Sequence, residues 1–181
     1  MMTELTSSPS GRAYDPVAKA LHWVVFLLLA AQYAVGSIMP HIGRKTLDEG
    51  WVAWHMSIGA TIVFFIVLRL AWRFTHPVPL APGMPPWQHR LASATHWLLY
   101  ILVIVMLVLG WAAANARGWD VKMFGLVTLP AIAANGARWG HQAGDIHDWL
   151  LYVLAAVIGL HVAGALYHQY VLKDDEIRRM V

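Results

Sequence analysis

Residues 146–170 read IHDWLLYVLAAVIGLHVAGALYHQY, and this stretch decides the fold. Asp148 is its only residue of the Asp, Glu, Lys or Arg type. An amphipathic helix on a soluble protein would carry a polar face along such a length. A helix of about 20 apolar residues is long enough to cross the hydrocarbon core of a bilayer. The stretch therefore predicts a transmembrane helix.

Three further apolar stretches are long enough to span a membrane, at about residues 17–39, 52–72 and 94–114. The whole chain is 59% hydrophobic and 13% charged, whereas soluble domains are about 45–50% apolar. A membrane is the solvent that suits this composition. The predicted fold class is all-α, a membrane-spanning four-helix bundle over residues 17–172.

The connections between these spans differ in length and composition. Residues 40–51 form a short loop, and residues 73–93 hold five of the nine prolines, so they cannot be helical throughout. Residues 115–145 are the longest connection. We expect them to fold back over the membrane face, with a short helix lying in the interface. Residues 1–16 and 173–181 are predicted to be polar cytoplasmic tails.

The distribution of basic residues predicts the orientation. Four spans place both termini on one side, and that side carries eight lysines and arginines against five on the other. Because cytoplasmic segments carry the excess of positive charge, both termini are predicted to be cytoplasmic. The eight on the terminal side are Arg12, Lys19, Arg69, Arg73, Arg90, Lys173, Arg178 and Arg179.

Charge and cysteine content exclude several classes of function. The formal net charge is +3, and the basic residues are scattered among the membrane-flanking segments, so no nucleic-acid partner is expected. The chain has no cysteine. Disulfides, iron–sulfur clusters and covalently attached c-type haem are therefore excluded. Ten histidines are the unusual feature of the composition.

Four of the histidines inside the predicted spans form pairs at two depths. Successive helices alternate in direction, which puts His22 near the cytoplasmic face and His55 near the outer face. His147 and His161 share one helix face because they are two heptads apart, and they differ in depth by about 21 Å. The depths predict an inner pair, His22 with His161, and an outer pair, His55 with His147.

Haem iron explains why histidine would occupy these positions. Ionisable groups inside a membrane are costly and generally functional, and a neutral imidazole is a good axial ligand for iron. Each pair therefore predicts one bis-histidine haem b. Zinc would need a third or fourth close ligand, whereas a lone histidine could serve as a hydrogen-bonding or proton-relay residue. His96 is the strongest rival ligand at the inner level.

Two further residues are candidates for contacts with these groups. Arg69 lies two heptads after His55, at the inner level, and is predicted to pair with a haem propionate. His168 lies at the cytoplasmic mouth, where it could bond a propionate or a quinone carbonyl, or simply face water. The other histidines fall in loops or at span ends and are predicted to be ordinary interfacial residues: His41, His76, His89 and His141.

Glycines recur at positions that correspond to the outer level. Gly36 and Gly110 lie two heptads after histidines of their own helices, and Gly59 lies one turn after His55. They could leave room for a flat macrocycle beside the outer iron. The alternative is that they merely permit close packing between helices.

The motifs that carry these residues resemble the bacterial cytochrome b561 family, over nearly the whole chain beyond residue 14. The resemblance implies a di-haem b four-helix bundle with His22, His55, His147 and His161 as axial ligands. It also implies electron transfer in the bacterial inner membrane that involves ubiquinone. One branch of the family is similar to superoxide oxidase. The motifs are LHW at 21–23, WHMSIG at 54–59, HWLLY at 96–100, FGLVTLP at 124–130, IHDWL at 146–150 and GLHVAGALYHQY at 159–170.

The expected function is electron transfer across the inner membrane to or from ubiquinone. Two histidine ligands leave iron no open position, so each haem is a relay and no side chain is assigned a catalytic role. Superoxide or a protein would be the donor, and superoxide would make the chain a quinone-reducing oxidoreductase. Two alternatives are a cytochrome b subunit that anchors a partner dehydrogenase or hydrogenase, and a metal or proton carrier without haem. Lipid and quinone are the other expected partners.

Overall fold

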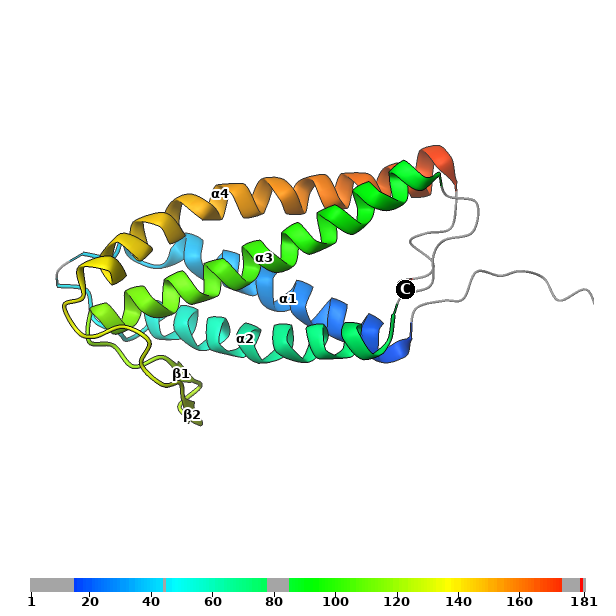
Figure 1. Cartoon of the computed structure of the whole chain (residues 1–181). Coiled ribbons are helices and arrows are strands. Elements are labelled where there is room, and N and C mark those ends of the chain that lie inside the picture. The colour runs from blue at the N-terminus through cyan, green and yellow to red at the C-terminus, as the bar shows by residue number, and fades with distance from the viewer. Residues whose placement is uncertain (1–14, 44, 78–84, 174–179, 181) are drawn as a thin grey trace, which may run out of the picture.

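The computed structural model describes residues 15–43, 45–77, 85–173 and 180. Four long helices dominate it (Figure 1): α1 (Pro16–Ile38), α2 (Trp51–Thr75), α3 (Pro86–Ala116) and α4 (Arg138–Tyr167). All four are long and apolar enough to cross a membrane. A short π-helix, η1 (His168–Leu172), continues α4. The predicted fold class, an all-α membrane-spanning bundle, is confirmed.

The helix ends follow from local sequence. Asp15 caps α1 by accepting a hydrogen bond from the Val17 amide, and Pro16 occupies the first turn, where its missing N–H costs nothing. α3 likewise begins on Pro86, which ends the proline-rich connection. α3 and α4 both start about two turns before the predicted spans. Hydropathy missed these turns because they are polar and extend beyond the apolar stretch.

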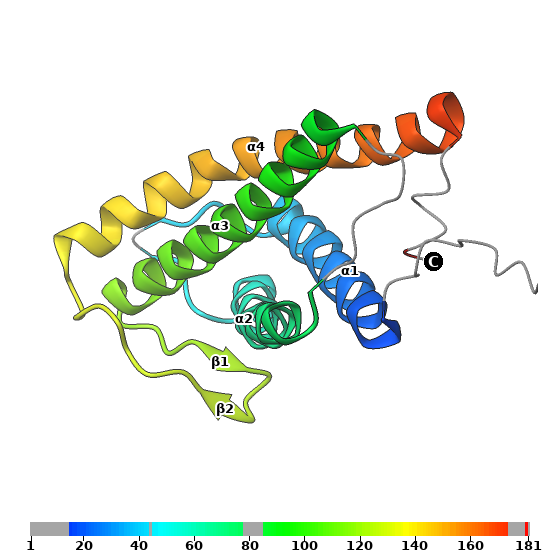
Figure 2. The same cartoon turned by 45° about the vertical axis from the view of Figure 1, so that its right-hand side comes forward.

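The helices associate as two pairs, α1 with α2 and α3 with α4, and α2 also contacts α3 (Figures 1 and 2). In the part of the chain that the structure describes, no Cα of α1 or α2 lies within 8 Å of a Cα of α4. Side chains alone face each other across this separation. α4 therefore stands apart from the two helices that carry His22 and His55.

The two ends of the bundle differ. The indole nitrogen of Trp23 donates to the Met180 carbonyl at 3.0 Å, so the end of the chain returns to the first turns of α1. We call this the terminal end. The opposite end carries residues 39–50 and 117–137, and we call it the loop end. The predicted tails, residues 1–16 and 173–181, lie almost wholly outside the described residues.

A buried apolar layer lies between the two ends. Ile62, which is fully buried, packs with Val25, Ile58, Tyr100 and Leu154 in one cluster. Leu154 is seven residues from both His147 and His161 of α4, and Ile62 is seven residues from His55. The apolar cluster therefore separates the two depths at which the histidines lie.

The α3–α4 connection, residues 117–137, returns to α3 through a hydrogen bond from the Gly136 amide to the Ala116 carbonyl, and it contains no helix of its own, because residues 138–145 of the predicted connection belong to α4. Two short antiparallel strands, β1 (Lys122–Met123) and β2 (Val127–Thr128), form a hairpin there. Phe124 and Gly125 both have positive φ, the conformation of a tight hairpin turn. Buried Asn115 ties the connection down: its amide donates to the Trp119 carbonyl and accepts from the Ile132 amide. The expectation of a separate interfacial helix was wrong, because the chain turns at Phe124 and Gly125 and forms this hairpin instead.

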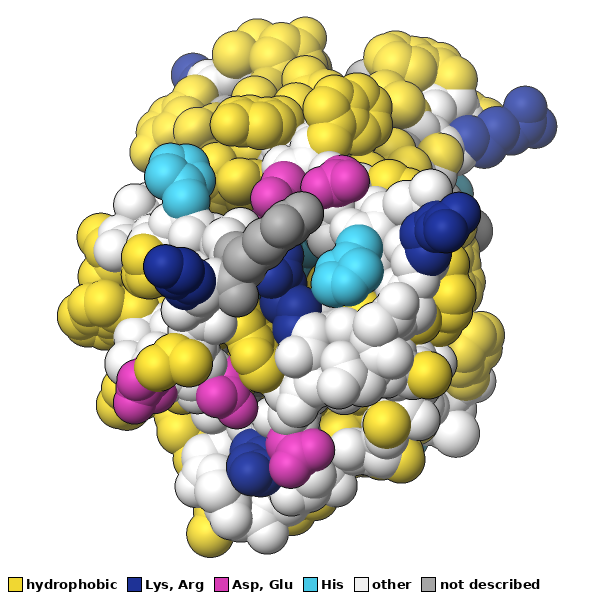
Figure 3. All heavy atoms as spheres, turned by 90° about the vertical axis from the view of Figure 1, so that its left-hand side faces the viewer, with side chains coloured by type: hydrophobic (Ala, Val, Ile, Leu, Met, Phe, Trp, Pro, Cys, Tyr) yellow, Lys and Arg dark blue, Asp and Glu magenta, His cyan; other side chains and the backbone are white. Residues whose placement is uncertain are grey.

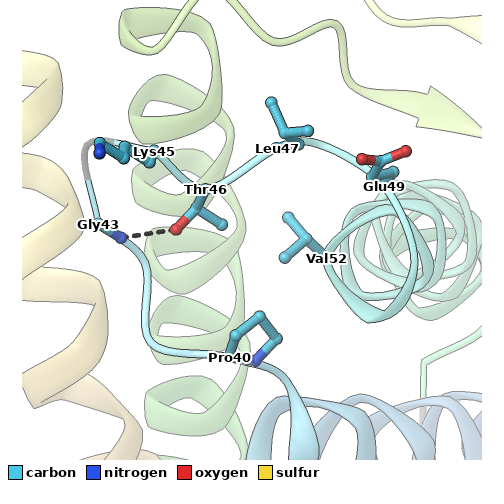
Figure 4. Close-up of a pocket in the computed structure, with 7 residues that line it drawn as sticks. All are labelled: Pro40, Gly43, Lys45, Thr46, Leu47, Glu49 and Val52. Carbon is cyan, nitrogen blue, oxygen red and sulfur yellow. Dashed lines mark hydrogen bonds between the residues drawn. The ribbon is translucent and has the colours of Figure 1, made fainter.

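The α1–α2 connection forms a shallow depression at the loop end (Figure 4). Its backbone is closed by a hydrogen bond from the Gly43 amide to the Thr46 hydroxyl at 2.8 Å. Lys45 and Glu49 line it, together with apolar and small residues. No histidine lines this depression, so we place the chemistry elsewhere.

Candidate functional site

The structure brings His55 and His147 together near the loop end. Their ring centroids lie 6.2 Å apart with an interplanar angle of 82°. His55 comes from the second turn of α2 and His147 from the third turn of α4, so the contact bridges two helices whose backbones stay apart. We call these two residues the loop-end pair. Both line one cavity of about 180 Å³ between the helices.

Hydrogen bonds orient the loop-end pair. Nδ1 of His147 donates to the Met106 carbonyl at 2.9 Å, and since a carbonyl only accepts, the proton is on Nδ1 and the lone pair of Nε2 is left available. The Gln32 amide nitrogen lies 3.0 Å from Nε2 of His55 and donates to it. Sequence reasoning assigned Gln32 no role. The signal was present, because an amide in an apolar span is costly without a partner.

Glycines give these side chains their room. A Cβ on Gly110 would lie 2.9 Å from Cε1 of His147, and a Cβ on Gly36 would lie 3.4 Å from Cε1 of His55. A Cβ on Gly59 would lie 3.4 Å from the Gln32 amide nitrogen. These glycines thus face the histidines and their hydrogen-bond partner. Close helix packing is the role of Gly140 instead, where a Cβ would collide with Ala116.

Three histidines meet near the terminal end. The rings of His22 and His161 are 6.4 Å apart at 66°, and those of His96 and His161 are 5.2 Å apart at 69°. The three come from α1, α4 and α3. We call them the terminal-end cluster. Both predicted pairs are therefore in contact, and the rival His96 lies beside His161 as well.

The ring spacings test whether a metal fits between two imidazoles. A metal–imidazole bond is about 2.0–2.1 Å and each ring nitrogen lies about 1.1 Å from its centroid, so two rings on opposite sides of one metal have centroids roughly 6.3 Å apart. The spacings for His55–His147 and His22–His161 agree with this value, whereas His96–His161 is too short. Among the described residues, no group of three or more His, Cys, Asp or Glu could hold a metal ion. The residues fit a two-ligand group such as haem iron.

Arg69 lies at the level of the terminal-end cluster, as predicted. It is close enough to interact electrostatically with all three histidines of the cluster. Its Nε donates to the Tyr100 hydroxyl at 3.0 Å, and Arg73 stacks over the rings of Trp97 and Tyr100. Within the described ranges, no carboxylate lies within ion-pair distance of Arg69. Its charge is thus available to an anionic group.

The remaining histidines lie at the periphery. His168 begins η1, half-buried, with its ring 6.3 Å from that of Tyr167. His76 stacks on Trp72 at the end of α2, which agrees with an interfacial role. His141 lines the cavity of the loop-end pair, although the sequence predicted no special place for it.

The loop end is polar and hollowed. Basic, acidic and histidine side chains surround a depression on this face (Figure 3). Arg117, His141, Asp145 and Asp148 are among the residues that line the cavity of the loop-end pair. Arg117 is held there by a hydrogen bond to the Gly43 carbonyl at 3.2 Å and by stacking over Trp119. A small donor in water would meet both signs of charge on the way to the histidines.

Comparison with known proteins identifies the family of this chain. Residues 13–181 match the family model described as prokaryotic cytochrome b561. The chain belongs to this family. It is therefore a multi-pass membrane cytochrome of electron transport, for which haem b is the expected group. The resemblance seen in the sequence motifs is confirmed.

The curated relatives extend over nearly the same length. The chain is 28% identical over 173 residues to cytochrome b561 homolog 2 of Escherichia coli (strain K12), with 93% of this chain and 90% of the relative covered. It is 30% identical over 172 residues to the probable superoxide oxidase CybB of Yersinia pestis, with 94% and 96% covered. It is 27% identical over 173 residues to cytochrome b562 of Cereibacter sphaeroides, with 93% and 94% covered.

Proposed function

We propose that the protein is a di-haem cytochrome b that passes electrons across the bacterial inner membrane to ubiquinone. The observation that carries the proposal is the geometry of α4. This helix supplies His147 to one pair and His161 to another, both at the spacing of rings on one metal, and both facing helices whose backbones stay apart. His55 and His22 would complete the two pairs that hold the haems.

The proposal assigns a role to the four histidines, to the apolar layer between them and to Arg69. The bound haems supply one-electron chemistry. The four histidines would hold and orient the two haems, and two histidines for each iron would leave no place for oxygen as a ligand. The apolar layer around Ile62 and Leu154 keeps water out of the space between the two levels. Arg69 offers its unpaired charge to an inner haem propionate.

The orientation places the acceptor at the terminal end. With both termini cytoplasmic, as the basic residues predict, the terminal-end cluster lies at the inner face and the loop-end pair at the outer face. Ubiquinone would accept electrons near the terminal end, and its protons would come from the cytoplasm. His168 lies at the mouth on this side and is our candidate for a hydrogen bond to the quinone carbonyl or to a propionate. Residues 17–172 form the di-haem domain and the two tails flank it.

Superoxide is the donor that we favour. The relative from Yersinia pestis is named as a probable superoxide oxidase, and the cationic side chain of Arg117 lines the loop-end cavity. Two superoxide ions would each lose one electron and leave as oxygen. One ubiquinone would take both electrons and two protons and become ubiquinol. The chain would then act as an enzyme without a proton-transfer residue at the outer site.

Purified protein in liposomes with ubiquinone tests this function. A xanthine oxidase system supplies superoxide outside, and ubiquinol formation is measured by absorbance. We expect ubiquinol to form much faster in liposomes with the wild-type protein than in liposomes with the His147→Ala variant. Added superoxide dismutase should abolish this difference. No acceleration by protein that carries both haems would contradict the superoxide function. Reduction only after addition of a dehydrogenase or hydrogenase complex would identify the anchor-subunit alternative instead.

A further inference from the structure

One contact in the loop-end pair contains two buried polar atoms without partners. They are Oε1 of Gln32 and Nδ1 of His55. The same two side chains meet through their other nitrogens, where the Gln32 amide donates to Nε2 of His55. Buried polar groups without partners are rare and ask for a physical explanation. Here one group is an acceptor and the other carries a proton whenever Nε2 holds none.

Two movements together would satisfy both atoms. If the Gln32 amide turns by half a revolution and the His55 side chain changes rotamer so that Nδ1 faces the amide, Oε1 of Gln32 accepts from Nδ1 of His55 and Nε2 becomes free. His147 already has this arrangement, since its Nδ1 donates to the Met106 carbonyl. Both rings of the pair would then be anchored through Nδ1 and would present Nε2 to a metal. Metal-bound histidines commonly donate their other N–H to an oxygen in this way.

We propose that Gln32 is a positioning residue for the outer haem, with its amide oxygen accepting a hydrogen bond from His55 when that histidine holds the iron. The inference rests on the proposed function, because it requires haem between His55 and His147. A hydrogen-bond acceptor on Nδ1 makes the imidazole a stronger donor to the metal. Stronger donation favours ferric over ferrous iron, so Gln32 lowers the midpoint potential of the outer haem.

Among the described residues, no amide side chain hydrogen-bonds to a histidine of the terminal-end cluster. Nδ1 of His22 is buried without a partner, and its charged neighbour is Arg69. The effect of Gln32 is therefore confined to one of the two haems. Space for the amide comes from Gly59, whose Cβ would lie 3.4 Å from it. Nothing else in the described part of the chain accounts for an amide at this depth of α1.

Redox titration of purified Gln32→Leu and Gln32→Glu tests the proposal. The His147→Ala variant identifies which potential belongs to the inner haem. We expect Gln32→Leu to raise the outer potential by up to 59 mV, a tenfold change in the ferrous-to-ferric ratio of a one-electron couple. Gln32→Glu should shift it the opposite way, and the inner potential should stay constant. The matched control is Gln169→Leu, which removes another unpartnered amide and should leave the outer potential unchanged.

The possible outcomes distinguish failure of the Gln32 role from failure of the proposed function. Gln32→Leu with both haems bound and an unaltered outer potential would overturn the role of Gln32 alone. A wild-type chain without two haems would overturn the proposed function instead. If Gln32→Leu loses only the outer haem and Gln32→Glu retains it, the positioning role is supported, because a carboxylate is also an acceptor.

A second, independent observation concerns the β1–β2 hairpin, whose tip is apolar. Leu126 is 83% exposed, and Phe124 and Val127 are each 48% exposed. The Phe124 ring lies 5.4 Å from that of Trp54, an exposed residue in the second turn of α2. The hairpin projects sideways from the bundle beside α2 in both views (Figures 1 and 2). It is therefore continuous with the lipid-facing surface of a spanning helix.

We infer that this tip lies in the lipid interface of the outer leaflet. Tryptophan near the end of a spanning helix marks the headgroup level, and Phe124 is in contact with such a residue. The apolar tip would be unfavourable in water but stable between headgroups and acyl chains. The charged pair Lys122–Asp120 lies at the base of the hairpin, where water would reach it.

Site-specific labelling tests the lipid contact, and the absence of cysteine from the chain makes it simple. Leu126→Cys and Ala131→Cys, both exposed positions of the same connection, are labelled with an environment-sensitive fluorophore in liposomes. We expect the label at 126 to emit at shorter wavelength and to be quenched by doxyl lipid, and the label at 131 to be quenched by aqueous iodide. Equal iodide quenching at both positions, with unchanged haem content, would overturn the inference.

Discussion

The two histidine levels achieve similar ring spacings by different means. At the loop end, uncharged groups orient the pair: the Met106 carbonyl holds His147 and the Gln32 amide contacts His55. At the terminal end, Arg69 lies near all three histidines of the cluster, and no amide of the described residues hydrogen-bonds to any of the three. The loop end also has two candidate ligands in contact, whereas the terminal end has three. Two histidine pairs with similar ring spacing therefore have different electrostatic surroundings.

The difference suggests a direction of electron flow. A cation close to a haem favours the reduced form, because reduction removes one positive charge from the iron. Hydrogen-bond acceptors on the ligating rings favour the oxidised form. We therefore expect the inner haem to have the higher potential and to draw electrons from the outer haem.

Removing one ligand of the loop-end pair should eliminate one haem. His147→Ala leaves His55 without its partner across the cavity, so we expect half of the haem per chain to be lost while the inner haem stays. Pyridine haemochrome assay against protein concentration measures this. His141→Ala, which removes a histidine from the mouth of the same cavity, is the control and should keep both haems.

At the terminal end, the two candidate partners of His161 should behave differently. His22→Ala should lose the inner haem, because its spacing to His161 is that of rings on one metal, whereas His96→Ala should retain both haems. The haem-to-chain ratio of the two variants decides between them. Loss of a haem from His96→Ala alone would make His96 the ligand and reverse our assignment.

Gly110→Ala should weaken the outer site without abolishing the fold. The added methyl would lie 2.9 Å from Cε1 of His147, and overpacking of this kind costs about 1–3 kcal/mol. We expect outer haem affinity to fall roughly tenfold or more, in the range seen when groups supporting a metal ligand are altered. Gly159→Ala, which would contact nothing within 4 Å, should bind haem normally in the same titration.

The smallest effect should come from the charge of Arg69. Arg69→Gln removes a cation beside the terminal-end cluster, so we expect the inner midpoint potential to fall by up to about 59 mV, equivalent to tenfold. Arg90→Gln, at an exposed position, serves as the control. If Arg69→Gln moved both potentials equally, the two levels would not differ as we describe.

The fold was largely predictable from the sequence because the bilayer imposes a simple rule. Each span must be long and apolar, and the four stretches meet that condition. Helix extension beyond the membrane was not predictable this way, since the first turns of α3 and α4 are polar. The hairpin was missed for another reason: strands as short as β1 and β2 have no detectable periodicity, and their turn places Phe124, an unusual residue, at positive φ.

The candidate site was predictable in part. Two heptads between His147 and His161 determine a common face and two depths, so the pairing followed from helix geometry. The closeness of His96 to His161 depends on how α3 rotates against α4, which spacing along one chain does not encode. The contact of Gln32 with His55 depends on the packing of α1 against α2. Both contacts depend on tertiary packing, which residue spacing within one helix does not determine.

The number of haems per chain tests the central claim most directly. Wild-type protein, purified in mild detergent, is assayed for haem b by pyridine haemochrome and for protein by amino-acid analysis. Our account predicts two haems per chain, one for each histidine pair that α4 completes. A ratio of one, or a protein without haem, would contradict it.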